Sequence, residues 1–410
     1  MARSALDGAG TPPDCRPPAA RMPKLMQKVS LLAVSLVAGA NTLVAQSSPT
    51  ANLASSAVVL ERTIVTQGGP GGPTAPGNPD DPRYNATFGR FTGANGIVSL
   101  RIVTNIGTFG CTGTLLQNRR QILTAAHCIT DGSRDVIASS IDVRFQGPSN
   151  TFERTITVNN AGTQPNPANM QVKPEYTGEV IDGSDLAVLT LPEEAPAFAT
   201  GVGLFGGTNS ALYGRQTTFA GYGSTGTGAT GDLQPGFAAR RRFGFNSFDA
   251  GCNADGSVCD GAANTHSILI ADLDNGNATG PITPGPNYNG NAICRLFGNP
   301  TANTQLCNTG STNDILDEVG IGRGDSGGAA FFDGLIAGVA SFGLRLDNAY
   351  AFGGWGTISG HVSVMEAGNR AWLNRVIVPT NVVPEPGTYA LMVTGLAILG
   401  GIARRRRHTA

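Results

Sequence analysis

The stretch that most constrains this chain is Gly-Arg-Gly-Asp-Ser-Gly-Gly at 322–328, directly before the apolar run at 329–332. Glycines on both sides of the serine predict a tight turn that another backbone can approach closely. A serine on such a turn is typical of a nucleophile, with backbone N–H groups beside it to hold an oxyanion. Because a hydroxyl is a weak nucleophile at neutral pH, a base and an orienting group are also needed.

The base must be a histidine, and the chain contains only His127, His266, His361 and His408. Only His127 has a telling context, Thr-Ala-Ala-His-Cys at 124–128, where an apolar stretch ends. Alone, either motif has a plain alternative, a buried histidine or a Gly-rich turn. Together and in this order, Thr-Ala-Ala-His-Cys and Gly-Asp-Ser-Gly-Gly resemble the trypsin/chymotrypsin family of serine endopeptidases. The resemblance implies that Ser326 is the nucleophile and His127 its base.

The orienting carboxylate is predicted at Asp185, in Gly-Ser-Asp-Leu-Ala-Val-Leu-Thr-Leu at 183–191. In this segment an acid is followed at once by a continuous apolar run, and it resembles the family's Asp-Ile-Ala-Leu-Leu pattern. The plain alternative is a turn aspartate at the start of a strand. Asp182 is the fallback candidate. The order His, Asp, Ser along the chain is the family's order.

The resemblance also implies the binding groups. The N–H groups of Gly324 and Ser326 correspond to the family's oxyanion hole, and Ser341-Phe342-Gly343 resembles its Ser-Trp-Gly, where an extended substrate pairs as an added strand. The pocket floor lies six residues before the nucleophile, at Gly320. Because Gly320 carries no charge, cleavage after apolar residues is predicted. If the loop is shifted, Asp317 or Glu318 could reach the pocket instead.

Six of the seven cysteines are expected to pair, which suits an exported protein. The resemblance implies a bond between Cys111 and Cys128, beside the histidine, and a loop bond between Cys294 and Cys307. Cys252 and Cys259 would close a small ring. Cys15 is left over in the leader.

The composition favours a loop-rich, all-β protein, because 57 glycines and 25 prolines occur among 410 residues and only 14% are charged. A net charge of −1 argues against a dominant nucleic-acid role. Strands are predicted at 97–103, 108–116 and 121–125, and a terminal helix at 369–378 packing on the second lobe. For residues 91–378 the resemblance implies two packed six-stranded antiparallel β-barrels with a short C-terminal helix.

Segments on both sides of this domain look like export and sorting elements. Residues 1–45 comprise a leader and a secretory signal peptide, with an apolar run at 29–40 that is short for a membrane span. Residues 46–90 are expected to be a disordered leader or propeptide, or a plain linker. Arg83 and Arg90 are candidate cleavage points for a propeptide. In the resembled family a new α-amino group pairs with the acid before the nucleophile, here Asp325.

The tail at 379–410 contains Pro384-Glu385-Pro386, an apolar run at 389–403 and four arginines, and it resembles a PEP-CTERM sorting signal. It implies a transmembrane helix, a sorting protease acting at the Pro-Glu-Pro motif, and delivery to the surface or extracellular matrix of a bacterium. The alternative is a plain tail anchor. Within the long stretch 224–321, Asp272 and Asp274 suggest Ca²⁺, but a solvated loop fits the spacing better. No cofactor is predicted.

The predicted function is therefore a secreted or surface-sorted serine endopeptidase acting on proteins or peptides through an acyl-enzyme. The competing hypothesis is a surface or matrix binding protein that keeps the protease fold without activity.

Overall fold

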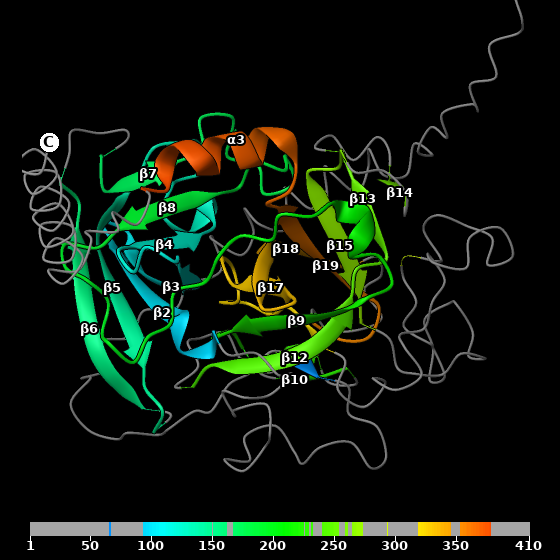
Figure 1. Ribbon diagram of the computed structural model, residues 1–410, viewed down its shortest axis with the longest axis horizontal. Coiled ribbons are helices and arrows are strands. Elements are labelled where there is room, and N and C mark those ends of the chain that lie inside the picture. Colours follow the sequence, from blue (N-terminus) through cyan, green and yellow to red (C-terminus); the bar gives the residue numbers. More distant parts are fainter. Residues whose placement is uncertain are drawn as a thin grey trace, which may run out of the picture.

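The computed structural model describes residues 65–66, 93–149, 151–161, 167–224, 226–228, 231–232, 240–253, 259–260, 265–273, 293, 319–345 and 353–378. Two antiparallel sheets, one in each lobe, form the framework of this part of the chain, so the all-β class with two antiparallel lobes is confirmed. In Figure 1 the blue-green sheet and the green-to-orange sheet lie side by side, with α3 along the top. The sheets have seven and eight strands instead of the six expected for each.

The first lobe is a seven-stranded sheet in the order β6-β5-β2-β3-β4-β8-β7. Its strands are β2 (Ile97–Thr104), β3 (Gly107–Leu115), β4 (Gln121–Thr124), β5 (Ala138–Gln146), β6 (Phe152–Asn159), β7 (Met170–Val172) and β8 (Ala187–Thr190). The three strands predicted from the apolar patterns coincide with β2, β3 and β4 to within a residue or two. The short helices η3 (Ala94–Gly96) and η4 (Ala126–Cys128) precede β2 and follow β4.

The second lobe is an eight-stranded sheet in the order β12-β9-β17-β18-β19-β15-β13-β14. Its strands are β9 (Gln216–Gly221), β12 (Arg242–Ser247), β13 (Ala250–Cys252), β14 (Cys259–Asp260), β15 (Ile268–Asp272), β17 (Ala329–Phe332), β18 (Leu335–Arg345) and β19 (Thr357–Ser363). The short helix η5 (Asn209–Ala211) comes just before this sheet.

A small four-stranded sheet lies beside the second lobe, in the order β11-β10-β1-β16. It comprises β1 (Val65–Thr66), β10 (Gly226–Thr227), β11 (Gly231–Asp232) and β16 (Val319–Gly320). The leader, expected to be without structure, therefore contributes β1, which pairs with β16 in the register Val65 to Gly320. The other leader residues up to 92 lie outside the described residues.

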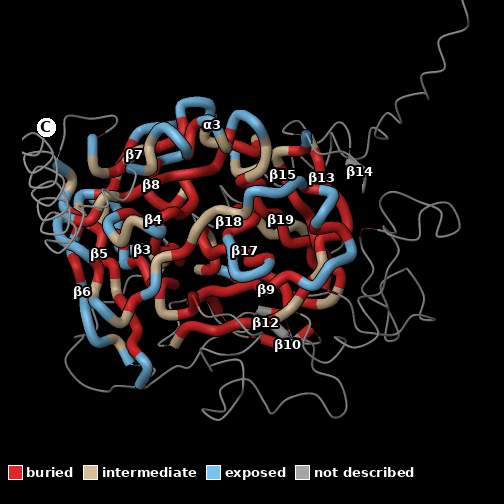
Figure 2. Tube along the Cα trace, viewed as in Figure 1, coloured by how far each residue is buried: buried red, intermediate tan, exposed pale blue. Residues whose placement is uncertain are grey.

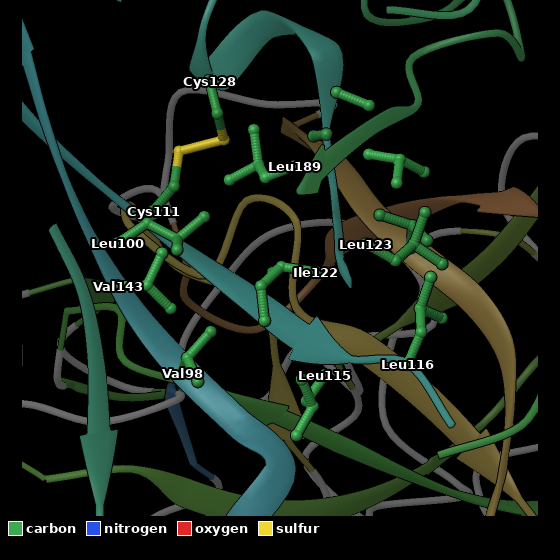
Figure 3. Close-up of a cluster of buried hydrophobic side chains, with 14 of the residues drawn as sticks. Val98, Leu100, Cys111, Leu115, Leu116, Ile122, Leu123, Cys128, Val143 and Leu189 are labelled. Carbon is green, nitrogen blue, oxygen red and sulfur yellow. A yellow bond between two sulfur atoms is a disulfide. The ribbon is translucent and has the colours of Figure 1, made fainter. Parts of the chain in front are cut away.

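The buried core is continuous across the two lobes. One cluster joins first-lobe residues such as Leu100, Ile122 and Val143 to second-lobe residues such as Val339 and Val362. Figure 3 shows its first-lobe part, with the Cys111–Cys128 disulfide at one edge. Figure 2 shows that the strands of both sheets are largely buried, while exposure concentrates in the connections and along β6. A core shared in this way fixes the two lobes against each other.

The terminal helix α3 (Ala367–Val376) confirms the predicted helix and begins at Glu366, whose side chain accepts the N–H of Asn369 at 2.8 Å. Its C-terminal end contacts the first lobe, because Gln121 of β4 donates to the Val376 carbonyl at 2.9 Å. The helix was expected to pack on the second lobe, and its first turn does contact that lobe, where Asn369 Nδ2 donates to the Ser363 carbonyl at 2.8 Å; the contact of its last turn with the first lobe was not expected. Its buried Trp372 and Leu373 belong to the cluster that spans both lobes.

Candidate active site

The position of His127 is fixed by the short helix in which it lies and by the disulfide of the next residue. It lies in η4, immediately after β4, between the buried residues Ala126 and Cys128. A disulfide joins Cys111 on β3 to Cys128, with Cα atoms 6.2 Å apart, and so confirms the implied pair. The same sulfur atoms lie near the His127 ring, but in a disulfide they offer no thiolate to a metal ion.

Asp185 lies against His127 because of strand register. β4 and β8 pair antiparallel with Thr124 opposite Ala187, which brings the end of β4 next to the start of β8. Asp185 is fully buried. Its Oδ2 lies 2.6 Å from His127 Nδ1, and its Oδ1 accepts the backbone N–H of His127 at 2.8 Å. The carboxylate therefore fixes both the ring and the main chain of the histidine.

The fallback carboxylate, Asp182, is engaged in its own loop. Its oxygens accept the N–H and hydroxyl of Thr177 at 2.7 and 2.9 Å and the N–H of Ser184 at 2.7 Å. These bonds cap the turn that leads to Asp185. The geometry thus pairs Asp185, and not Asp182, with the histidine.

The Asp185 carboxylate raises the affinity of the His127 ring for a proton. Burial by itself lowers the pKa of His127, but the charge of the Asp185 carboxylate and its hydrogen bond outweigh burial and leave the pKa above 6.5. An imidazolium that forms here is stabilised by the adjacent carboxylate, as a general base requires when it takes up a proton.

The loop that carries Ser326 connects β16 to β17 and depends on its glycines. Gly324 and Gly327 have φ angles of 93° and 81°, a backbone conformation that residues with a side chain rarely adopt. A Cβ at Gly327 would lie 2.0 Å from Thr124 Oγ1, on the strand that leads to His127. The buried Asp325 turns inward, and its carboxylate accepts the N–H groups of Gly223 and Gly322 at 2.7 and 2.9 Å.

Ser326 itself is partly exposed beside the histidine segment. Its carbonyl accepts the N–H of Thr112 at 2.8 Å and lies 3.7 Å from Cys128 Sγ. In the part of the chain that the structure describes, the Ser326 hydroxyl makes no hydrogen bond to the ring of His127. The N–H groups of Gly324 and Ser326, among those same residues, donate to no acceptor. They remain available to an added oxygen.

The predicted pocket floor, Gly320, is buried on β16. A Cβ there would lie 3.5 Å from Ser359 Oγ and 3.6 Å from Leu273 Cβ, so a neutral hydroxyl and an apolar side chain surround it. Ser359 Oγ accepts the N–H of Ile321 at 3.1 Å. Asp317 and Glu318 lie outside the described residues.

The Ser341-Phe342-Gly343 segment lies on β18, opposite β19. The register shifts between Ala340 and Phe342, so Ser341 is the extra residue of a β-bulge. Its hydroxyl contacts the Asp185 carboxylate and donates to the Val180 carbonyl at 2.8 Å. Sequence reasoning assigned Ser341 to substrate binding and missed this contact, for which no local pattern gives a signal. Phe342 covers Gly360, and Gly343 pairs with Ser359.

The remaining cysteines are described only in part. Cys252 is disulfide-bonded, and Cys259 lies directly opposite it in the β13–β14 pair. Cys294 and Cys307 lie outside the described residues. Asp272, considered for Ca²⁺, is buried on β15 and its Oδ2 accepts the N–H of Ile293 at 2.9 Å. Asp274 is not among the described residues.

Comparison with protein families decides the resemblance. Residues 91–236 match the trypsin family. Residues 382–407 match the PEP-CTERM protein-sorting motif. Residues 91–236 thus resemble the trypsin family and residues 382–407 form a PEP-CTERM protein-sorting motif, so both predicted resemblances are confirmed. No curated protein matches the chain.

The solved structures that are similar to this chain include neuropsin and HL collagenase. Neuropsin, a serine protease expressed in the limbic system of mouse brain, has 15% identity, a TM-score of 0.41, and coverage of 69% of this chain and 95% of neuropsin. HL collagenase has 17% identity, a TM-score of 0.42, and coverage of 70% and 96%. At these values the likeness assigns no residue role.

Among the described residues no helix is both long and apolar enough to cross a bilayer. The apolar run of the tail, the Pro-Glu-Pro motif and the predicted signal peptide all lie outside the described residues.

Proposed function

We propose that this chain is an exported serine endopeptidase in which Ser326, His127 and Asp185 form the catalytic triad. The observation that carries the proposal is the pair of hydrogen bonds between the buried Asp185 and His127, at 2.6 Å to Nδ1 and 2.8 Å to the backbone N–H. Because Nδ1 is bonded to Asp185, Nε2 is the ring nitrogen that can take a proton from Ser326. Catalytic hydrogen bonds are often long before substrate binds, so the unbonded Ser326 hydroxyl agrees with this role.

The mechanism follows from these groups. Ser326 Oγ attacks the scissile carbonyl carbon while His127 Nε2 takes the hydroxyl proton, and Asp185 stabilises the imidazolium. The oxyanion accepts from the N–H groups of Gly324 and Ser326, which have no other acceptor among the described residues. His127 then gives its proton to the leaving amine as the C–N bond breaks. Water repeats the sequence and releases the acid from Ser326.

Apolar or small P1 side chains suit the proposed pocket. Among the described residues, the side chains nearest to a Cβ at Gly320 are those of Leu273 and Ser359, and neither offers a charge for a substrate lysine or arginine. Burying an unpaired cation against them would be costly. The substrate backbone would pair with Gly343 as an added strand. A peptide library in which cleavage after Arg or Lys dominates would refute this pocket, whereas cleavage after Leu, Phe or Ala agrees with it.

Fluorophosphonate labelling of the purified protein tests the proposed chemistry. Wild type should label, and Ser326→Ala and His127→Ala should lose labelling while remaining folded. Asp185→Asn should slow labelling by roughly four orders of magnitude, because the amide favours the wrong tautomer of the ring. Asp182→Asn is the matched control and should keep most of the rate. A folded wild-type chain that does not label would instead favour the inactive binding protein.

The sorting signal supports export to the cell surface. In this proposal the signal peptide directs export, the tail anchors the chain in the membrane for a time, and a sorting protease cuts at Pro384-Glu385-Pro386. The mature surface protein should then lack the four arginines at 404–407. Mass spectrometry of surface-extracted protein with an intact C-terminus would favour a plain tail anchor.

A further inference from the structure

Thr112 connects three separate parts of the proposed site. It is fully buried on β3, directly after Cys111 of the disulfide. Its backbone N–H donates to the Ser326 carbonyl at 2.8 Å, and its carbonyl accepts the hydroxyl of Thr124 at 2.8 Å. Thr124 ends the strand that leads to His127. The main chain of Thr112 therefore joins the nucleophile loop to the strand of the base.

The side-chain hydroxyl of Thr112 makes two further hydrogen bonds. Its Oγ1 accepts the backbone N–H of Tyr222 at 3.0 Å and donates to the Gly324 carbonyl at 3.0 Å. Tyr222 directly follows β9 of the second lobe. This one hydroxyl therefore both donates and accepts a hydrogen bond at the boundary between the two lobes.

The two carbonyls that Thr112 bonds, those of Gly324 and Ser326, affect the orientation of the proposed oxyanion donors. The Gly324 carbonyl belongs to the peptide unit between the two donors, the N–H groups of Gly324 and Ser326. The Ser326 carbonyl belongs to the peptide unit that follows the one containing the Ser326 N–H. With its φ of 93°, Gly324 is a residue at which the backbone can turn over at low cost. Hydrogen bonds to both carbonyls therefore set the direction in which the two N–H groups point.

We propose that Thr112 is a positioning residue that holds the oxyanion loop in its active conformation through its side-chain hydroxyl. This inference rests on the proposed protease function and adds a residue from the opposite lobe to it. Thr112→Val has nearly the same shape but leaves the Tyr222 N–H and the Gly324 carbonyl without their partner. Thr112→Ser keeps the hydroxyl and loses only a methyl group.

Thr114 supplies a matched control. It lies two residues along the same strand, on the same face, and is equally buried. Its hydroxyl has no hydrogen-bond partner among the described residues. Thr114→Val makes the same chemical change as Thr112→Val on the same strand without removing a hydrogen bond.

The experiment measures labelling by a fluorophosphonate as kinact and KI, together with thermal unfolding. Thr112→Val should lower kinact about tenfold to a hundredfold with KI nearly unchanged, because the oxyanion contacts form only in the transition state. Thr112→Ser and Thr114→Val should keep kinact within about threefold of wild type. A role in folding alone would change the melting temperature and leave kinact unchanged below it.

Each outcome separates the hypotheses. A folded Thr112→Val with wild-type kinact overturns the positioning role and leaves the proposed protease intact. If Thr112→Val does not fold, Thr112→Ala replaces it and is compared with Thr112→Ser, with equal kinact overturning the inference and a loss only in Ala supporting it. A folded wild-type chain that does not label overturns the proposed function and this inference together.

Discussion

His361 should make this protein less stable as the pH falls. It lies on β19, is 1% exposed, and its ring centroid is 4.5 Å from that of Phe219 and 5.2 Å from that of Phe248. Its Nδ1 has no hydrogen-bond partner among the described residues. Burial lowers the pKa of His361 to about 3, because an imidazolium between two aromatic rings would lose its hydration.

The sign and size of the expected change in the free energy of unfolding follow from the linkage between proton binding and folding. In the unfolded chain a histidine titrates near pH 6.5, so above this pH both states are neutral and His361 contributes no pH dependence. Below it the unfolded chain binds a proton that the folded chain does not, and the free energy of unfolding falls by about 1.4 kcal/mol for each pH unit. Between pH 6.5 and 4.5 the expected loss is therefore about 2–3 kcal/mol.

Urea unfolding of wild type and His361→Phe at pH 7.5 and 4.5 measures this loss. Phenylalanine fits a site between aromatic rings and does not titrate, so it should remove the loss. The stability of wild type relative to the variant should fall by about 2–3 kcal/mol on acidification. Subtracting the variant cancels the other titrating groups.

His127 provides a control of opposite sign. The pKa of His127 is raised in the folded state, so its contribution to stability is present below pH 6.5 and is lost as the pH rises through the folded pKa. The stability of wild type relative to His127→Gln should therefore rise on acidification. A wild-type-to-His361→Phe difference that stays constant between the two pH values would refute the argument for His361.

Three further outcomes concern the supports of the site. The buried Lys173 donates to Ser184 Oγ at 2.9 Å, directly before Asp185 of the proposed triad, so Lys173→Met should slow fluorophosphonate labelling about tenfold. Glu175→Gln, which removes the exposed ion-pair partner of Lys173, should not slow it, and equal rates for the two variants would contradict this. Thr66→Pro should cost about 1–3 kcal/mol in urea unfolding, because β1 is paired on both edges, and unchanged stability would show that this strand adds nothing. Deletion from Val383 onward should release the protein in soluble form, and retention in the membrane fraction would count against the sorting role of the tail.

Local patterns in the sequence determined the main elements. The apolar runs predicted β2, β3, β4 and α3, and two short motifs marked the trypsin-like resemblance that the family comparison confirms. The cysteine after the histidine gave the pair with Cys111 through that resemblance. These features could be predicted because each depends on neighbours a few residues apart, where the periodicity and the turn chemistry are fixed.

Contacts between distant segments were decided only by the tertiary structure. Asp185 rather than Asp182 meets His127 because of the register between β4 and β8, which the aspartates themselves do not encode. Ser341 reaches Asp185 because a bulge in β18 turns its side chain, and Thr112 reaches Gly324 across 212 residues of sequence. Register, bulges and the packing of two lobes arise from the whole set of pairings at once, so no single stretch of this chain carries the information.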